Sequence, residues 1–191
     1  MKIVLPEDRP KIEVPIKDGR TATLSPVLSS DREFFEKGID ALSIESRYAR
    51  FGQGVAHLTE WELDYLSDVD QRTHVAWGAA VDGQVAGVGR YILPADGGCP
   101  ELAITVLDEF QRHGVGTALF RALIAIARAD GVGEICFEAQ SDNRAVLQLI
   151  GEMEVAPFLD GDTIERRLRI GDIPATSLDA EYLAVIDEVR R

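Results

Sequence analysis

Hydrophobic positions recur at two different spacings along the chain. In several short segments apolar and polar residues alternate, and in others apolar residues return every third or fourth position, so both strands and helices are predicted. The predicted strands are 11–16, 20–28, 74–81, 85–93, 101–106, 134–139, 155–159 and 163–170. The predicted helices are 30–42, 115–130, 142–153 and 178–190. A further helical region follows the first helix; it is interrupted near residues 52 and 54 and resumes over 59–67. This alternation indicates an α/β protein with a mixed sheet and flanking helices.

Turn and cap residues mark the ends of several of these elements. Asp18-Gly19 and Asp82-Gly83 each separate two predicted strands, and this dipeptide favours a tight hairpin turn. Ser30 is the expected N-cap of the first helix, with Glu33 completing a capping box. Thr59 is expected to cap the helix over 59–67.

Composition narrows the class of protein further. A chain of 191 residues is one medium domain, or one domain with a tail, and can bury a sizeable core. The net charge of −13 argues against binding to nucleic acid or to an acidic membrane surface, and it favours cationic partners such as amines or lysine side chains. Because the chain shows neither a membrane-spanning apolar run nor a secretory signal, we expect a cytoplasmic protein.

Neither the cysteines nor the histidines form a recognisable metal pattern. Cys99 lies in a Gly-Gly-Cys-Pro turn and Cys136 in an apolar strand, which predicts neither a metal set nor a disulfide framework. The three histidines are scattered along the chain, so no metal is expected.

The most informative segment is the glycine turn Gln111-Arg112-His113-Gly114-Val115-Gly116-Thr117-Ala118. It follows the predicted strand 101–106 and opens an amphipathic helix, so it would direct unpaired backbone N–H groups and a positive helix end at one point. That arrangement suits a diphosphate.

Two other phosphate motifs fit this turn less well. A P-loop would need Lys-Ser or Lys-Thr after Gly116, where the chain has Thr117-Ala118. A dinucleotide fingerprint would need a third glycine at the position of Leu119, although Glu138 lies at the distance of its acidic residue.

The order of these features resembles the GCN5-related N-acetyltransferase (GNAT) superfamily over residues 20–170. The resemblance rests on Val106, Phe110, the Gln111-Arg112-x-Gly114-x-Gly116 turn, the strand near 134–138 and Asn143. A longer set of residues over 46–91, including Ser46-Arg47-Tyr48 and Gly87-Val88-Gly89-Arg90-Tyr91, is similar to the acetyltransferase domain of bacterial Pat-type protein lysine acetyltransferases.

The resemblance implies a fold and a domain organisation. The GNAT fold has a mixed, mostly antiparallel central sheet with one splayed pair of parallel strands and flanking helices. The expected organisation is an N-terminal extension or strand over 1–19, the acetyltransferase domain over 20–170, and a C-terminal tail with a short helix over 171–191. This helix is expected either to pack over the fold or to mediate a dimer, so the protein is expected as a monomer or a homodimer.

Acetyl-CoA is the cofactor that the resemblance implies, as the acyl donor. The residues implied in contact with it follow the strand, the glycine turn and the next helix start: Ile104, Thr105, Val106, Gln111, Arg112, His113, Gly114, Val115, Gly116, Thr117 and Asn143. The Val106 backbone would pair with the pantetheine arm and polarise the acetyl oxygen. An ordinary N-cap is the alternative role of Asn143.

Acetyl transfer to an amine requires a base, and two carboxylates are candidates. The resemblance places a base at Glu101 or, as in some members, at Glu138; a solvated strand-end carboxylate is the alternative reading of Glu101. We expect the active carboxylate to be partly desolvated, because this raises its pKa. His74 matches the Pat-type pattern and would border the acceptor cleft, with a structural hydrogen bond as its other role.

The predicted function is therefore an acetyl-CoA-dependent N-acetyltransferase whose acceptor is an amine, in the Pat-type case a protein lysine. One alternative is a small-molecule amine acetyltransferase. Another is a non-catalytic acyl-CoA-binding sensor, which is favoured because Ile150 stands where many relatives have a tyrosine acid.

Overall fold

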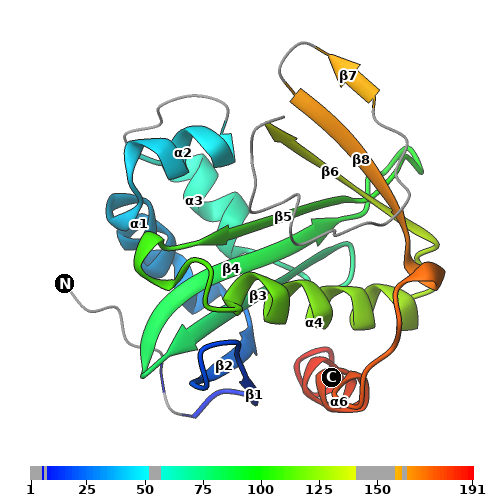
Figure 1. Cartoon of the computed structure of the whole chain (residues 1–191), viewed down its shortest axis with the longest axis horizontal. Helices are drawn as coiled ribbons and strands as arrows, with labels where there is room; N and C mark the ends of the chain where they lie inside the picture. The colour runs from blue at the N-terminus through cyan, green and yellow to red at the C-terminus, as the bar shows by residue number, and fades with distance from the viewer. Residues whose placement is uncertain (1–5, 7, 52–56, 141–157, 161–162) are drawn as a thin grey trace.

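A twisted sheet with helices on both faces organises the protein (Figure 1). The computed structural model describes residues 6, 8–51, 57–140, 158–160 and 163–191. The strands are β1 (Ile12–Pro15), β2 (Thr21–Pro26), β3 (His74–Val81), β4 (Gln84–Ile92), β5 (Glu101–Val106), β6 (Glu134–Gln140), β7 (Phe158–Asp160) and β8 (Thr163–Arg169). The α-helices are α1 (Arg32–Ala41), α2 (Ile44–Phe51), α3 (Glu60–Ser67), α4 (Val115–Ala129) and α6 (Asp179–Val189). Short 3-10 helices are η1 (Ser29–Asp31), η2 (Asp108–Phe110) and η3 (Ile170–Asp172).

The described strands form a single eight-stranded sheet in the order β1-β2-β3-β4-β5-β6-β8-β7. Every neighbouring pair is antiparallel except β5 and β6, which are parallel. β5 pairs with β4 along its whole length, but it pairs with β6 only at Glu101 and Cys136. The expected mixed sheet with one splayed parallel pair is therefore confirmed.

Most predicted elements are present, and their local signals explain why. The strand over 101–106 has the predicted bounds, and α4 begins directly after the glycine turn. Both predicted hairpins form, with Gly19 at φ 86° and Gly83 at φ 73°, a left-handed conformation that glycine adopts readily. The predicted helix 142–153 and residues 155–157 lie outside the described residues.

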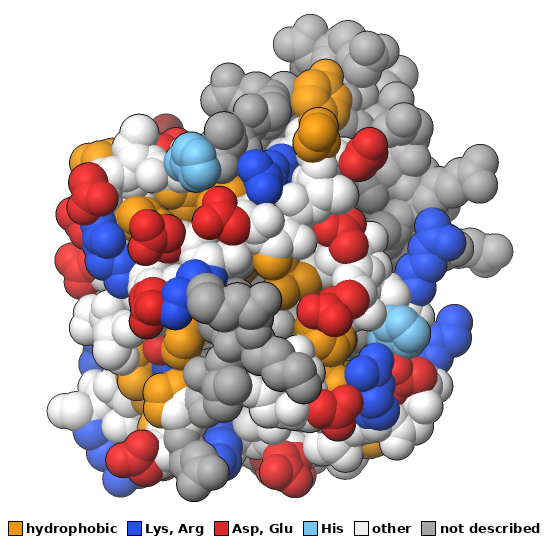
Figure 2. All heavy atoms as spheres, turned by 90° about the vertical axis from the view of Figure 1, so that its left-hand side faces the viewer, with side chains coloured by type: hydrophobic (Ala, Val, Ile, Leu, Met, Phe, Trp, Pro, Cys, Tyr) orange, Lys and Arg blue, Asp and Glu red, His pale blue; other side chains and the backbone are white. Residues whose placement is uncertain are grey.

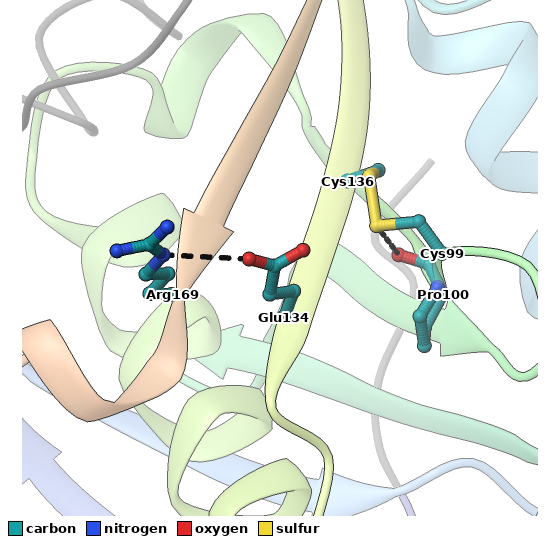
Figure 3. The surroundings of a disulfide bond; sticks show 5 residues. All are labelled: Cys99, Pro100, Glu134, Cys136 and Arg169. Atoms are coloured by element: carbon teal, nitrogen blue, oxygen red, sulfur yellow. Dashed lines mark hydrogen bonds and ion pairs between the residues drawn. A yellow bond between two sulfur atoms is a disulfide. The ribbon is translucent and has the colours of Figure 1, made fainter.

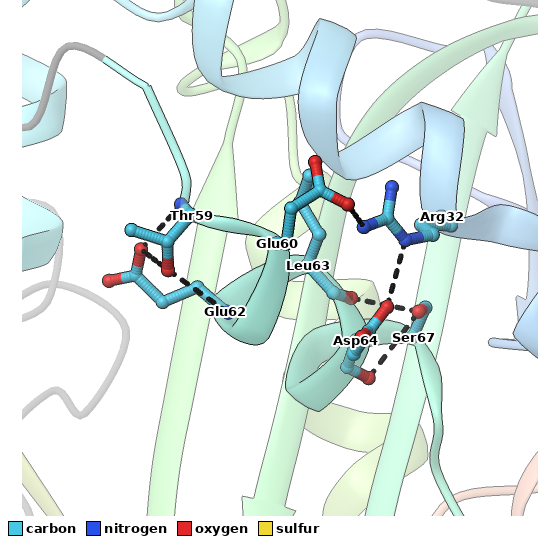
Figure 4. Close-up of polar contacts among 7 residues, drawn as sticks. All are labelled: Arg32, Thr59, Glu60, Glu62, Leu63, Asp64 and Ser67. Atoms are coloured by element: carbon cyan, nitrogen blue, oxygen red, sulfur yellow. Dashed lines mark hydrogen bonds and ion pairs between the residues drawn. The ribbon is translucent and has the colours of Figure 1, made fainter.

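The two helix caps differ in outcome. Thr59 caps α3 as predicted: its hydroxyl accepts from the Glu62 N–H at 3.2 Å, and the Glu62 carboxylate accepts from the Thr59 N–H at 2.7 Å (Figure 4). Ser30 does not cap α1, because it lies within η1 and the helix starts one residue later than predicted, with Asp31 at its N-cap. The Asp31 carboxylate instead accepts from the Leu28 N–H at 2.9 Å and from the buried Arg9 at 2.6 Å.

The core lies mainly between the sheet and α4. Ten of the fifteen residues of α4 are buried, because its apolar stripe faces the strands. On the same side of the sheet, α6 packs against α4, and its Tyr182 meets Trp77 of β3 edge to face at 5.9 Å. Arg128 of α4 and Asp179 of α6 form an ion pair at 2.7 Å. Neither α4 nor any other described helix has the length and apolarity needed to cross a membrane.

Cys99 and Cys136 form a disulfide, so the expectation of two unpaired cysteines is wrong (Figure 3). Their Cα atoms are 5.8 Å apart, within the range that a disulfide requires. The bond ties the turn cluster over 94–100 to β6 at the one position where β5 and β6 pair, and the Cys136 N–H donates to the Pro100 carbonyl at 2.7 Å. Strand register, which is a long-range property, brings the two cysteines together.

Breaking this disulfide should lower the free energy of unfolding. The bond closes a loop of 37 residues. By restricting the unfolded chain, a loop of that size raises the free energy of unfolding by about 2–4 kcal/mol. Urea unfolding of the oxidised protein, the reduced protein and the thiol-free Cys99→Ser/Cys136→Ser variant measures the effect. The reductant should leave the double variant unchanged; equal midpoints for oxidised and reduced protein would contradict the prediction.

Candidate active site

The glycine turn joins β5 to α4 and holds two residues in the left-handed region. Arg112 has φ 64° and is exposed, and Gly114 has φ 101° at the N-cap of α4. The first N–H groups of a helix have no intrahelical acceptor. Here the N-cap has no side chain to accept from them, and the first turn contains no acidic residue that would oppose an anion.

Gly114 and Gly116 fulfil different structural requirements. A Cβ built on Gly114 would lie 2.8 Å from the backbone nitrogen of Lys17, and the φ of Gly114 is unfavourable for any L side chain. A Cβ on Gly116 would meet its nearest neighbour, Val106 Cγ2, at an ordinary 3.6 Å. Gly114 is therefore needed for the backbone path, whereas Gly116 places α4 against the end of β5.

The β1–β2 hairpin supports the turn from the other side. The Lys17 N–H donates to the His113 carbonyl at 3.0 Å, and His113 Nδ1 lies 3.0 Å from an Asp18 carboxylate oxygen. Asp18 also pairs with Arg20 at 2.7 Å. The hairpin thus fixes the backbone and the side chain of the residue that precedes Gly114.

Gln111 and Asp108 connect the turn to α2. The Gln111 side-chain amide donates to the Val106 carbonyl and to Ser46 Oγ, both at 3.1 Å. Asp108 accepts from the Ser43 N–H at 2.8 Å and from Ser46 Oγ at 2.6 Å. Burial raises the pKa of Asp108, but these hydrogen bonds outweigh it, so the pKa lies below its ordinary value and the carboxylate stays charged. The sequence pattern named Ser46 only as part of the Pat-type resemblance, and it did not single out Ser43 or Asp108.

The backbone of β5 directs polar groups toward β6. The Leu107 N–H donates to the Ala86 carbonyl at 2.9 Å, which makes this antiparallel pair a hydrogen-bonded one. Because such pairs alternate along an antiparallel ladder, the N–H and C=O groups of Val106 and Ile104 point away from β4, toward the splayed side. They lie beside the first turn of α4, since Gly116 packs against Val106.

The side chains of β5 separate the two faces of the sheet. Ile104 and Val106 face α4 and lie near Gly116. Ala103 and Thr105 face α1 and line a cavity of about 100 Å³, otherwise bounded mainly by apolar side chains of α1, β3 and β4. Strand alternation therefore directs the Glu101 side chain toward the α1 and α3 side.

Glu101 lies in a row of paired residues that crosses three strands. It pairs with Ile92 of β4, which pairs with His74 of β3, so the three side chains share one face of the sheet. Adjacent strands are about 4.8 Å apart, which puts the His74 and Glu101 backbones roughly 10 Å apart. The Glu101 side chain is exposed, so the expected partial desolvation does not exist in the protein alone.

His74 is buried and held by polar contacts. A guanidinium can only donate, so His74 Nε2 is the acceptor in its 3.0 Å contact with Arg90 NH1. The backbone N–H of His74 donates to the Asp70 carboxylate at 2.8 Å, and the His74 ring lies 5.3 Å from the Tyr65 ring. Burial, followed by the Arg90 charge, lowers the pKa of His74 to about 4, so the ring is neutral at pH 7.

The structure places three of the remaining candidate site residues, Glu138, Val115 and Thr117. Glu138 lies in β6 two residues after Cys136, and its backbone pairs with Glu165 of β8. Val115 is buried and Thr117 is exposed on the first turn of α4. Asn143 and Ile150 lie outside the described residues.

A parallel pair of strands splays beside a glycine turn and a helix N-terminus, and comparison with known proteins identifies the family to which the chain belongs. The chain belongs to the GNAT acetyltransferase family, whose model matches residues 39–153, and it is an N-acetyltransferase. It is 32% identical over 138 residues to an acetyltransferase of Pseudomonas aeruginosa, covering 70% of this chain and 74% of that protein.

The similarity extends to acetyltransferases named Pat. The chain is 33% identical over 147 residues to acetyltransferase Pat of Mycolicibacterium smegmatis, covering 74% of this chain but only 43% of that protein. The GNAT domain of S. lividans PAT superposes with a TM-score of 0.76 at 22% identity, covering 86% of this chain and 99% of that domain. A Salmonella typhimurium protein solved with its cofactor acetyl-CoA gives a TM-score of 0.64 at 16% identity, covering 81% of this chain and 96% of the other.

Alanine substitutions should distinguish the two glycines of the turn. Gly114→Ala forces a side chain into a left-handed conformation and against Lys17, so it should lower the free energy of unfolding by at least about 1–3 kcal/mol. Gly116→Ala, the matched control, should be neutral or stabilising by up to about 1 kcal/mol, because its site is helical and has room for a methyl group. Urea unfolding measures both, and equal stabilities would contradict the assignment.

Proposed function

We propose that the protein transfers the acetyl group of acetyl-CoA to the side-chain amine of a protein lysine. The proposal for the donor rests on two sets of backbone groups. The N–H groups that open α4 suit the pyrophosphate, and the outward-directed groups of Ile104 and Val106 suit the amide-bearing pantetheine arm. The acetyl-CoA present in the Salmonella typhimurium structure supports this assignment.

Individual residues of the glycine turn would have distinct roles. The side-chain amide of Gln111 and its backbone N–H, which donates to the Asp108 carbonyl at 3.3 Å, form hydrogen bonds inside the protein. Gln111 would therefore shape the turn, while Arg112 and the first N–H groups of α4 would contact the phosphates. Thr117 and His113 border the same turn, and Asn143 remains a proposed contact to the cofactor arm.

Glu101 is the base that we propose. It would accept a proton from the lysine ammonium through bridging water, because Glu101 and Val106 lie at opposite ends of β5, and the neutral nitrogen would attack the thioester carbonyl carbon. The Val106 N–H would stabilise the developing oxyanion. The nitrogen then gives up its second proton to water, the C–S bond breaks, and the coenzyme A thiolate takes a proton from water or another group. Because Glu101 is exposed, the arriving acceptor would supply the desolvation that a carboxylate base needs.

The acceptor is proposed from charge and exposure. The net charge of −13 suits a cationic acceptor, and Glu101 lies at an exposed position that a lysine on a protein surface could reach. The similarity to acetyltransferases named Pat agrees with this choice. We further propose a cytoplasmic location; since disulfides are rare there, Cys99 and Cys136 would be reduced in the cell.

Acetyl-CoA should raise the melting temperature of the protein, and Gly116→Glu should abolish the shift. The added carboxylate would lie at the proposed pyrophosphate position, where it repels the ligand, while Gly116 itself has room for a Cβ. Thermal melts with and without acetyl-CoA measure the shift, and Gly116→Ala is the control that should keep it. An unchanged melt of the unmodified protein would refute the donor assignment.

Glu101→Gln should lower turnover by about 10²-fold or more, the range expected for loss of a general base. The acetyl-CoA melting shift should persist, because Glu101 lies away from the glycine turn. Glu138→Gln is the matched comparison, and if it alone removes turnover, Glu138 is the base. Lysine-containing peptides and small amines such as spermidine serve as acceptors: transfer to spermidine alone indicates a small-molecule enzyme, and binding without transfer indicates a sensor.

A further inference from the structure

Three aromatic rings form a continuous row from the exposed face of α3 to β3. Trp61 and Tyr65 are stacked, with ring centroids 5.4 Å apart and an interplanar angle of 11°. Tyr65 in turn lies 5.3 Å from the His74 ring. Trp61 is 71% exposed and Tyr65 44%, whereas His74 is buried at the inner end of the row. We call these three residues the aromatic row.

The aromatic row leads toward Glu101. His74 shares its cross-strand row with Ile92 and Glu101, so Tyr65, which packs on His74, lies on the same face of the sheet as the proposed base. This face is opposite the one covered by α4, the helix that follows the glycine turn. A polypeptide lying along the aromatic row would therefore approach Glu101 from the side that the acetyl donor leaves open.

Acidic residues surround these rings. Residues 59–74 contain five carboxylates (Glu60, Glu62, Asp64, Asp68 and Asp70) and a single basic residue, Arg72. Arg32 of α1 pairs with Glu60 at 2.5 Å and with Asp64 at 2.9 Å, and one cation cannot balance both (Figure 4). Figure 2 shows acidic side chains interspersed with lysine and arginine side chains on the face that carries α1 and α2.

An exposed tryptophan on a segment with a net negative charge is a surface that attracts cations. The face of tryptophan or tyrosine attracts an ammonium or guanidinium group, and nearby negative charge strengthens the attraction. The inner ring adds no opposing charge, since His74 accepts a hydrogen bond at Nε2 and is neutral at pH 7. The buried Arg90 behind it is 4% exposed and pairs with the Phe35 ring at 5.2 Å.

We propose that the aromatic row is the docking surface for a cationic polypeptide segment, with an arginine or lysine near the acceptor lysine stacking on the exposed face of Trp61. The inference rests on the proposed lysine acetyltransferase function and adds to it a preference for basic sequence around the modified lysine. An exposed tryptophan on a solvent-facing helix then has a role in substrate recognition.

Direct binding is the first test, and it does not depend on turnover. The probe is a fluorescein-labelled peptide with one N-acetylated lysine flanked by arginines, and the matched control carries citrulline, the neutral isostere of arginine, at the same positions. We expect the citrulline peptide to bind about threefold to tenfold more weakly in an anisotropy titration, the range of one or two exposed cation–π contacts. Equal affinities would overturn the proposal.

Trp61 offers a second readout because the chain has only two tryptophans and the other, Trp77, is fully buried. The arginine peptide should reduce acrylamide quenching of the protein fluorescence, since it covers Trp61. Trp61→Leu keeps an apolar side chain but lacks a π face, and it should weaken peptide binding about threefold or more. Trp61→Phe, which retains a ring, should weaken it less. Equal binding by the leucine and phenylalanine variants would refute the role of the ring.

Kinetics then separate this inference from the proposed function. With an unacetylated arginine-flanked lysine peptide, Trp61→Leu should raise the peptide KM and leave both kcat and the acetyl-CoA melting shift unchanged. Acetylation with an unchanged KM would overturn the docking surface and leave the function intact. Peptide binding that needs Trp61 but produces no acetyl transfer would overturn the proposed function and leave the docking surface intact. A dimer that dissociates in Trp61→Leu would assign the surface to a second copy of the chain and overturn the proposal.

Discussion

The hydrogen bonding of β5 is the constraint on which the rest of the site depends. One edge of this strand is fully paired with β4, and the other is paired with β6 at a single position, Glu101 to Cys136. The in-plane backbone groups of Ile104 and Val106 therefore point toward the splay, while the side chains alternate above and below the sheet. A donor recognised by backbone groups and an acceptor approached by the Glu101 side chain can thus use the same six residues from perpendicular directions.

The two sides of this strand differ in how far contacts within the protein fix their geometry. On the α4 side, the geometry is fixed before any ligand binds, because Gly114, the hairpin and the Gln111 contacts determine the path of the turn. On the α1 and α3 side, Glu101 and Trp61 are exposed to water. In the proposed function, the braced glycine turn and the exposed Glu101 suit an acceptor that is a surface residue of another macromolecule, since such an acceptor brings its own desolvating bulk.

Local signals made most of the fold predictable from the sequence. The bounds of β5, the start of α4, the two hairpins and the Thr59 cap all depend on residues within a few positions of one another. The errors concern contacts between distant residues: the Cys99–Cys136 bond needs the register of β5 and β6, and the start of α1 depends on the pairing of Asp31 with Arg9. At the site, the glycine turn was evident from its spacing, but its links to Ser46 and Lys17 were not, because neither residue is near it in sequence.

The contact between Lys17 and the glycine turn bears on how far the donor half could be treated as a transferable module. The family match begins at residue 39, so the hairpin lies outside the segment by which the family is identified. Yet the Lys17 N–H bonds the His113 carbonyl and lies against Gly114. A graft of residues 101–130 into a foreign scaffold would carry every residue of the glycine turn and lose the hairpin loop that braces it. Protein engineers who wish to move this site would have to transplant a loop that lies almost a hundred residues upstream.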